Sequence, residues 1–405
     1  MNTPATAIQE WRQYWTLPVA AALGYSTAVL LSFGLGPFIQ PIQQEFGWSR
    51  ASISMGITIA GLTSAAFGIP MGMVVDRWGP RRVGLVGLVL MPAAFALLGT
   101  ATGSLTNWLM LWGCIAIANL GLQSTVWTSA VASRFETSRG LAFAMTLSGG
   151  SLTSTVLPLI ATAFIIAFDW RVAFMAVGGI WFMATFPLAL LFFRGAQDTG
   201  GKWRRSAAAP VVDLPGLTVA EAIRTSAFYK LLAASGLFAF TAIGTIIHFV
   251  PILTDRGATP MGAAGIASIV GIFSFIGRLG TGLLLDRFSG RLVGAGIFLL
   301  PVISCALLLF DGANPTSQAS AAAFFGFTVG AEIDVIAFLI SRHFGLKSYG
   351  VIFGAIVTAL ATGTALGPLA AGAAFDRFGG YSEFIILTAV LMGLSSLAVA
   401  SLEEA

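Results

Sequence analysis

The chain has 405 residues, of which 57% are hydrophobic and 9% are charged, and its formal net charge is +4. Its mean hydropathy is +0.88. A soluble globular domain carries about 25% charged residues, so this composition excludes a nucleic-acid-binding protein and an ordinary cytosolic enzyme. The two cysteines, Cys114 and Cys305, lie far apart in apolar runs, and we predict neither a disulfide framework nor a metal site.

The chain begins with a short polar segment in which Trp11, Arg12, Tyr14 and Trp15 are typical of an anchor at the membrane surface. Apolar runs of about 20 residues or more follow, the length that a helix needs to cross a bilayer. They are too long and too uniformly apolar for the alternating strands of a membrane barrel. We therefore predict an all-α membrane protein with twelve transmembrane helices, at residues 16–40, 51–75, 83–102, 107–132, 140–167, 171–193, 227–253, 261–285, 292–310, 318–341, 349–373 and 382–401.

The distribution of Lys and Arg orients these helices. Of the 21 Lys and Arg residues, 16 fall in segments on the side of the N-terminus, four on the opposite side, and one, Arg278, within a span. Because basic residues concentrate in cytoplasmic loops, we predict that both termini are cytoplasmic. Short loops without a signal-peptide pattern favour a bacterial inner membrane. The longest polar stretch divides the chain into a six-helix bundle at 1–193, a cytoplasmic linker at 194–226 and a second six-helix bundle at 227–405.

The two halves of the sequence resemble each other. Residues of the same type recur about 210 positions apart, and the charged positions recur with the same spacing as the glycines and prolines. Six spans in each half keep both copies in the same orientation, so the repeat is parallel, which is typical of secondary transporters with a site between the halves. The matching pairs include Gly34 and Gly244, Pro41 and Pro251, Gly61 and Gly271, Gly72 and Gly282, Asp76 and Asp286, Arg77 and Arg287, Arg81 and Arg291, and Pro158 and Pro368.

The loop after the second predicted span carries a family signature. It reads GMVVDRWGPRR from Gly72 to Arg82, and a degenerate copy follows the eighth span. Over its whole length the chain thus resembles the major facilitator superfamily. An acid at a helix end pairs with a nearby arginine or caps a neighbouring helix, and such contacts bias a two-state equilibrium. The resemblance therefore implies a conformational role, with topology alone as the alternative, for Asp76, Arg77, Arg81, Asp286 and Arg287.

A narrower resemblance is to the monocarboxylate and oxalate/formate branch of that superfamily. It rests on residues 45–50, which read EFGWSR, and on the GRLGTG stretch from Gly277 to Gly282. In that branch the arginine at this position of the eighth span binds a substrate carboxylate, and the resemblance implies this role for Arg278. The chain departs from the branch at Ser274, where vertebrate members have an aspartate. It also lacks a lysine in the first span and a charge in 349–373.

Three charged side chains lie in the interior of the predicted spans, namely Arg278, Glu332 and Asp334. A charge at the bilayer centre costs at least about 2.5–3.5 kcal/mol, so these residues are candidates for function. Arg278 and Asp334 each lie eight residues before the inner end of a helix, about 12 Å deep. A pair of Arg278 with either acid is therefore plausible, whereas the two acids cannot face one point. We predict that Arg278 binds a carboxylate and that Asp334 or Glu332 carries a proton; a structural salt bridge is the alternative.

Other polar residues in the spans are candidates for the wall of a substrate cavity. His248 is one of two histidines and is predicted to contact the substrate or relay a proton, unless it is bonded to a backbone carbonyl. Asn119, Gln123 and Trp127 are spaced by four and are predicted to share one helical face. Tyr25 in the first span completes the set, and helix–helix packing is the alternative for each of them.

The sequence thus predicts a secondary transporter that takes up a small organic monocarboxylate with a proton. An organic-anion exchanger, an exporter of amphipathic or cationic compounds and a transporter-derived sensor are the alternatives. No nucleophile–base pair or metal-binding motif of an enzyme is found. We therefore expect no enzymatic activity, no cofactor and no nucleic-acid partner. The expected partners are the lipid bilayer, protons and the carboxylate, and we expect a monomer.

Overall fold

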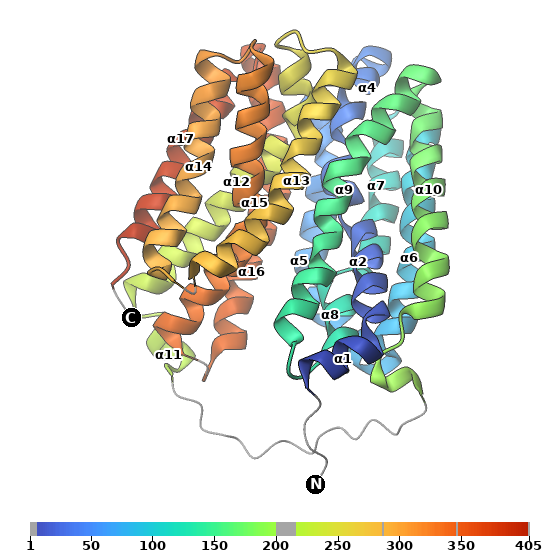
Figure 1. Cartoon of the computed structure of the whole chain (residues 1–405). Coiled ribbons are helices and arrows are strands. Elements are labelled where there is room, and N and C mark those ends of the chain that lie inside the picture. The colour runs from blue at the N-terminus through green and yellow to red at the C-terminus, as the bar shows by residue number, and fades with distance from the viewer. Residues whose placement is uncertain (1–5, 200–215, 286, 346, 404–405) are drawn as a thin grey trace. The chain divides into compact units, whose positions relative to one another are not determined.

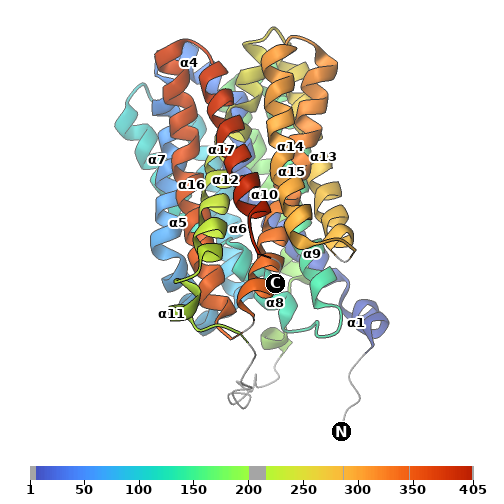
Figure 2. The ribbon, with the colours of Figure 1, turned by 90° about the vertical axis from the view of Figure 1, so that its left-hand side faces the viewer.

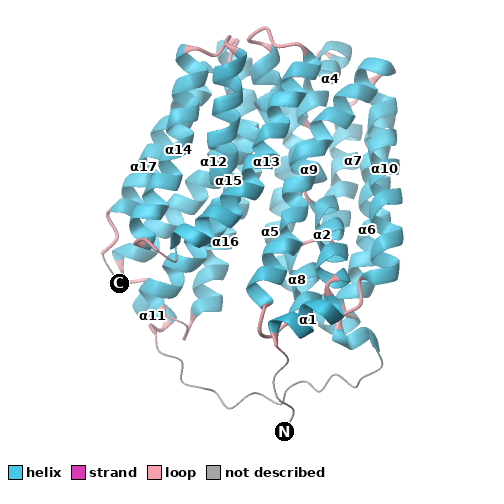
Figure 3. Ribbon diagram, viewed as in Figure 1, coloured by secondary structure: helices cyan, strands magenta, loops and turns pink. Residues whose placement is uncertain are grey.

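The protein is almost entirely helical. The computed structural model describes residues 6–199, 216–285, 287–345 and 347–403, and within those ranges it contains no strand beyond an isolated bridge between Gly216 and Gly345 (Figure 3). Among these residues, eleven helices are long and apolar enough to cross a membrane. The first span, broken between Ala28 and Leu30, raises the number to twelve. This confirms the predicted all-α membrane fold.

The helices form two compact units (Figure 1). Unit one consists of Met1–Gly34 and Ala66–Ala207, and unit two of Leu35–Ala65 and Ala208–Ala405. The segment 35–65 packs with the C-terminal helices although it belongs to the first two spans. The predicted bundle boundaries at 193 and 227 stay a prediction, and residues 200–215 of the predicted linker lie outside the described residues.

Unit one is built around pairs of long helices. The first predicted span begins in this unit and packs on the fifth span, and the third span packs on the sixth. Large aromatic side chains such as Trp108, Trp112 and Phe174 fill its core. Its helices are α1 (Ala7–Tyr14), α2 (Thr16–Ala28), α3 (Leu30–Gly34), the second half of α5 (Arg50–Trp78), α6 (Pro80–Leu97), η2 (Leu98–Thr100), α7 (Leu105–Leu120), α8 (Ser124–Ala132), α9 (Arg139–Ala167), α10 (Trp170–Phe192) and η3 (Ala196–Thr199).

Unit two contains the C-terminal six spans together with the segment 35–65. Its helices are η1 (Gly36–Phe38), α4 (Ile39–Phe46), the first half of α5, α11 (Val219–Ala222), α12 (Ser226–Thr254), α13 (Pro260–Leu285), α14 (Gly290–Phe310), α15 (Pro315–Phe344), α16 (Tyr349–Phe378) and α17 (Ser382–Ala400). The core lies around α12, which packs against α16 and α17 (Figure 2), while α13 and α14 pack against α15. In its most apolar stretch 78% of α12 is buried, more than in any other described span, so polar side chains on α12 must find partners inside the protein.

Polar residues in the gaps between apolar runs set the helix ends. Asp169 accepts a hydrogen bond from the Val172 N–H at 2.8 Å and begins α10, and Asn314 begins α15 with Pro315 in the first turn. At the other end of a helix, Gly379 takes a φ of 74° and terminates α16. That left-handed conformation favours glycine, which explains the turn before α17.

The internal repeat has a structural counterpart at two arginines 210 positions apart. Arg81, near the start of α6, donates from Nη2 to the Leu190 carbonyl at 2.6 Å and from Nη1 to the Phe193 carbonyl at 3.0 Å. Arg291, near the start of α14, donates to the Leu402 carbonyl at 3.2 Å. Each arginine thus binds the carbonyl end of the last span of its own half, where a cation is favoured. The same sequence motif performs the same local task twice.

Candidate functional site

Arg278 and Asp334 form an ion pair between α13 and α15. Arg278 Nη1 lies 3.6 Å from Asp334 Oδ2, and the side chains are 13% and 37% exposed. The two helices approach closely because glycines lie between them: a methyl group added at Gly330 would collide with the Ser274 carbonyl, and one at Gly277 with the Phe327 carbonyl. The structure therefore brings together the arginine and one of the acids that the sequence predicted as partners.

The guanidinium of Arg278 is not saturated with hydrogen bonds. Its Nε and Nη1 atoms are buried and have no hydrogen-bond acceptor among the described residues. The 3.6 Å separation from Asp334 exceeds the roughly 2.7–2.9 Å of a charge-assisted hydrogen bond. Buried donors without an acceptor cost about 1–3 kcal/mol each, and native proteins rarely keep them without a use.

Glu332 and Asp334 lie on different faces of α15. Thr328 donates to the Ile297 carbonyl of α14, and Val335 lies close to Gly294 of the same helix. Glu332 lies between these two at helical spacing, and so it shares the face toward α14, whereas Asp334 pairs with α13. Two residues apart on a helix corresponds to a rotation of about 200°. Glu332 is 5% exposed, and its Oε1 has no hydrogen-bond partner among the described residues.

His248 on α12 is completely buried and engaged through both ring nitrogens. Nδ1 lies 2.7 Å from the Tyr381 hydroxyl, and Nε2 lies 3.0 Å from the Pro368 carbonyl and 3.1 Å from the Ser54 hydroxyl. These contacts come from α16, α5 and the turn before α17. The sequence offered a substrate contact, a proton relay or a carbonyl-bonded imidazole; the carbonyl bond is present, and the other two roles stay predictions.

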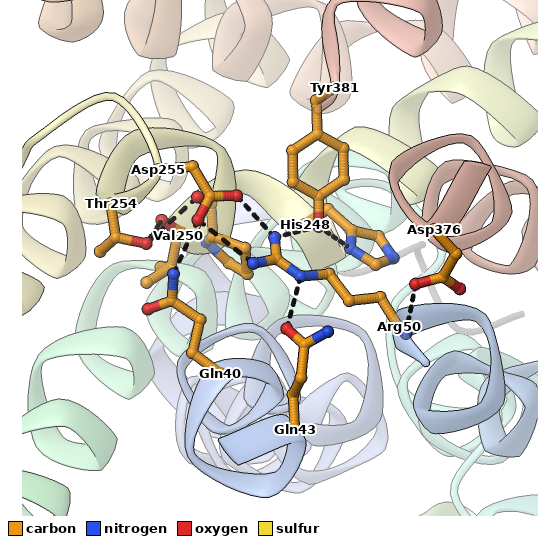
Figure 4. A network of polar contacts seen from close by, with 10 residues as sticks. Gln40, Gln43, Arg50, His248, Val250, Thr254, Asp255, Asp376 and Tyr381 are labelled. Atoms are coloured by element: carbon orange, nitrogen blue, oxygen red, sulfur yellow. Dashed lines mark hydrogen bonds and ion pairs between the residues drawn. The ribbon is translucent and has the colours of Figure 1, made fainter. Parts of the chain in front are cut away.

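Next to His248 is a dense set of contacts around Arg50, the first residue of α5, which is 3% exposed (Figure 4). Its Nη1 donates to Asp255 Oδ2 at 2.7 Å and to the Tyr381 hydroxyl at 2.8 Å, and Nη2 donates to Asp255 Oδ1 at 3.2 Å. Nε donates to Gln43 Oε1 at 3.0 Å. All three guanidinium nitrogens are therefore engaged. We call Gln40, Gln43, Arg50, Asp255, Asp376 and Tyr381 the Arg50 cluster.

The rest of the Arg50 cluster fixes the start of α5. Asp376 of α16 accepts hydrogen bonds from the backbone N–H groups of Arg50 and Ala51, both at 2.9 Å, and thereby caps the helix with a carboxylate. Arg50 also lies 3.5 Å from the ring centre of Phe375. Burial raises the pKa of the Tyr381 phenol, against the opposing charge of Arg50, so the hydroxyl stays protonated.

In unit one, the predicted face of Asn119, Gln123 and Trp127 is interrupted. The expectation of one continuous helical face was wrong, because α7 ends at Leu120 and α8 begins at Ser124. In a continuous helix the Val126 N–H would donate to the Leu122 carbonyl, but here it donates to the Gln123 carbonyl. The Leu122 carbonyl accepts a hydrogen bond from the Trp127 indole N–H at 2.9 Å. The Trp127 ring is fully buried against Gly24 and Gly84, so it forms part of the core of unit one.

The remaining predicted residues of unit one are more accessible. Tyr25, Asn119 and Gln123 are each half-buried, and Tyr25 packs near Gly150 of α9. The Oδ1 atom of Asn119 is buried without a hydrogen-bond partner among the residues that the structure describes. Asn119 therefore keeps an unused acceptor, as expected of a ligand-binding side chain, whereas Trp127 does not.

The predicted conformational residues lie at loop ends. Asp76 and Arg77 are exposed and line an open pocket of about 680 Å³ together with Arg81. Arg81 itself binds the end of α10, as described above, and Arg287 is exposed. Asp286 lies outside the described residues. A conformational role for these residues stays a prediction.

Sequence reasoning missed the Arg50 cluster. Its members are spread over α4, α5, the end of α12, the end of α16 and the turn before α17, so no spacing in the chain indicates them. Two signals were available. Arg50 closes the EFGWSR stretch that resembles the monocarboxylate branch, and it is one of four basic residues in segments predicted to lie outside.

Paired membrane spans with charged side chains in their interior are typical of membrane transporters. The chain matches the Major Facilitator Superfamily over residues 21–368 and belongs to that superfamily. Monocarboxylate transporter 13 of Bos taurus is 25% identical over 375 residues, which cover 92% of this chain and 84% of the relative. Among solved structures, a bacterial homologue of the human lysosomal transporter Spinster has a TM-score of 0.71 at 18% identity, covering 96% of both chains. The nucleoside transporter NupG has a TM-score of 0.72 at 12% identity, covering 95% of this chain and 98% of its own. These two likenesses show the fold, with its two six-helix repeats.

Proposed function

We propose that this transporter imports a small organic monocarboxylate together with one proton and that Arg278 binds the carboxylate. The observation that carries the proposal is the buried guanidinium of Arg278, whose Nε and Nη1 have no acceptor among the described residues. A guanidinium donates two parallel hydrogen bonds to a planar carboxylate from its Nε–Nη2 edge or its Nη1–Nη2 edge, and each edge contains one of these two atoms, which matches one anionic group on the substrate. The similarity to monocarboxylate transporters over most of the chain supports the same substrate class.

Charge balance supports coupling to a single proton. In the empty site, the positive charge of Arg278 is balanced by Asp334. A bound carboxylate takes over that balance and leaves Asp334 with an uncompensated negative charge in the membrane interior. A proton on Asp334 restores neutrality, and it also removes the cost of about 2.3 kcal/mol per 100 mV that a monoanion pays when it enters a negative cell. The distribution of Lys and Arg supports cytoplasmic termini.

Binding is tested first, with the purified transporter in detergent. We expect a monocarboxylate such as lactate, pyruvate, acetate or benzoate to raise the melting temperature, because a ligand at a hundred times its dissociation constant stabilises by about 2.7 kcal/mol. The matched amides have nearly the same shape without the charge and serve as control ligands. If amides stabilise as well as acids, or if no acid stabilises, Arg278 is not a carboxylate site.

The role of Arg278 is tested by Arg278→Lys, which keeps the charge but loses the planar fork. Loss of one charge-assisted hydrogen bond of about 1.5–3 kcal/mol weakens binding by about 10- to 150-fold. Arg377→Lys makes the same chemical change at an exposed arginine and is the matched control. We expect normal affinity in the control, measured by the same thermal titration. Equal affinity in both variants would leave Arg278 with a structural role only.

Proton coupling is tested by Asp334→Asn in proteoliposomes. With a neutral residue at 334, Arg278 and the carboxylate balance each other, so we expect uptake that no longer rises with an inward proton gradient. Glu383→Gln, at an exposed acid in the first turn of α17, is the control and keeps the gradient dependence. Uptake that instead requires carboxylate inside the vesicle would identify an anion exchanger.

A further inference from the structure

The Arg50 cluster joins the first two spans to the C-terminal helices. The junction is close-packed: Thr58 donates to the Ala365 carbonyl at 2.6 Å, and a methyl group added at Gly36 would lie 2.9 Å from the Ile247 carbonyl. Residues 35–65 belong to unit two by packing, yet the chain continues from them in both directions into helices of unit one. Alternating access requires the two halves to part at each end in turn, so these contacts must break when the carrier opens at this end.

We infer that the Arg50 cluster is a latch at the outer end of the carrier and that a proton taken up by His248 releases it. The inference rests on the proposed function for two points, the orientation that places Arg50 outside and the coupling to protons. The latch itself is a matter of geometry. A bidentate pair of the buried Arg50 with the partly exposed Asp255 holds the closed form, and opening exchanges this pair for water.

Arg50 and His248 are linked through the Tyr381 hydroxyl, and the donors and acceptors along this link are fixed. The Pro368 carbonyl only accepts, so Nε2 of His248 carries the hydrogen and donates to it at 3.0 Å. Nδ1 of the neutral ring is then an acceptor for the Tyr381 hydroxyl at 2.7 Å. The oxygen of Tyr381 in turn accepts from Arg50 at 2.8 Å. The latched arrangement therefore needs a neutral imidazole.

A second proton on His248 disrupts this arrangement of donors and acceptors. Nδ1 would become a donor facing the Tyr381 hydroxyl, which already uses its hydrogen toward Nδ1 and its oxygen toward Arg50. The proton would also add a second buried positive charge beside Arg50. The charged and titratable groups around the ring are Arg50 of α5, Asp255 of α12, Asp376 of α16 and Tyr381, and both carboxylates already bind Arg50 or its backbone. Among the described residues, no carboxylate hydrogen-bonds the imidazole itself.

Proton binding and opening are thus linked. The latched form disfavours a second ring hydrogen, which would break the hydrogen bond from Tyr381 to Nδ1 and bury a second positive charge beside Arg50, whereas an imidazole in contact with water takes up a proton near pH 6.5. Because the open form alone binds this proton, acid shifts the population toward it. Between pH 7.5 and pH 5.5 the ratio of open to latched molecules is expected to rise about tenfold from this one group. External acid would then open the carrier on the side from which the proton enters.

The test measures the latch directly, without substrate. Spin labels on cysteines placed at Gln44 of α4 and Thr259 before α13, both exposed, report by pulsed electron resonance whether α4 has left α12 and α13. Cys114 and Cys305 are first replaced by Ser. We expect a second, longer distance whose population relative to the shorter one rises about tenfold from pH 7.5 to pH 5.5. In Arg50→Leu the longer distance should dominate at both pH values.

His248→Gln is the decisive variant. Glutamine offers one donor toward the Pro368 carbonyl and one acceptor toward Tyr381 but takes up no proton, so the latch should close at both pH values. Tyr381→Phe is a second variant, which removes the link to Arg50 and should flatten the pH response even if His248→Gln folds poorly. Asp255→Asn separates the two proton sites: it weakens the latch and should raise the longer distance at both pH values, but the tenfold rise in the ratio of open to latched molecules should persist.

Three results would overturn the inference: no change of distance with pH in the parent protein, an unchanged response in His248→Gln, or a response lost in Asp255→Asn and kept in His248→Gln. Failure of the proposed carboxylate transport would be seen elsewhere, in the thermal titrations and uptake. Arg278→Lys should keep the pH-dependent distances whatever the substrate is, so the two proposals fail separately.

Discussion

In unit two, Arg50 and Arg278 both have buried guanidinium nitrogens, but their guanidinium groups are bonded in opposite ways. Arg50 donates from all three nitrogens to Asp255, Tyr381 and Gln43 and lies on the face of an aromatic ring. Arg278 has a single ion pair at 3.6 Å and two buried nitrogens without an acceptor among the described residues. Under the proposed function, this difference assigns the two arginines two different tasks. A saturated guanidinium stabilises a conformation, and an unsaturated one keeps its hydrogen bonds available for a ligand.

The largest expected effect is a loss of stability, and it tests the comparison of the two arginines directly. Arg50→Leu removes the guanidinium that donates to Asp255, Tyr381 and Gln43 and should cost at least about 1.5–3 kcal/mol, the value of one charge-assisted hydrogen bond. Arg278→Leu also leaves an acid without its cation, but the pair is long at 3.6 Å and the Asp334 side chain is 37% exposed, so the loss should be below about 1 kcal/mol. Both variants are compared by thermal melting in detergent without substrate. An equal loss in the two variants would mean that Arg278 is as structural as Arg50.

A smaller effect on stability extends the comparison to unit one. There the Trp127 indole N–H has a hydrogen-bond acceptor, whereas Asn119 Oδ1 has no hydrogen-bond donor among the described residues. Trp127→Phe keeps the ring packing but removes the donor to the Leu122 carbonyl, which should cost about 1–3 kcal/mol of stability. Its substrate affinity should be unchanged. Asn119→Ala removes a side chain with an unused acceptor and should leave the melting temperature nearly unchanged. If Trp127→Phe were as stable as the parent protein but bound substrate more weakly, Trp127 would be part of the wall of the substrate cavity, as the sequence predicted.

The smallest effect on stability at neutral pH concerns Glu10 of α1, whose two carboxylate oxygens both accept hydrogen bonds. Burial disfavours its charge, yet the backbone N–H groups of residues 136–138 and the Ser138 hydroxyl lower its pKa to about 2. The ordinary value is 4.5, so its stabilising contribution is fully present above pH 4.5 and is lost as the pH falls toward 2.

In Glu10→Gln this part of the acid-side decline should disappear, which melting curves between pH 5.5 and pH 3 would reveal. Glu136→Gln changes an exposed acid of the same loop and should keep the decline. If both variants retain the decline, Glu10 does not hold α1 against the start of α9.

The sequence alone determined the membrane fold, because long apolar runs leave few alternatives once backbone groups must be satisfied inside a bilayer. It also placed Arg278 and Asp334 at the same depth, since both lie eight residues from a helix end and helical rise converts that count into depth, but it left Asp334 and Glu332 as alternative partners of Arg278. The motif repeated near Arg81 and Arg291 likewise marked equivalent helix ends before the structure was known.

The tertiary structure decided the rest. The break between α7 and α8 depends on a local exchange of carbonyl partners that no periodicity announces. The partition of Glu332 toward α14 and Asp334 toward α13 depends on which helices pack on α15. The Arg50 cluster joins residues that are more than 200 positions apart in the chain, such as Arg50 and Asp255, whose separation in sequence is 205. Such contacts are fixed by helix packing alone, because hydrogen bonds depend on distances in space and carry no trace in the order of residues.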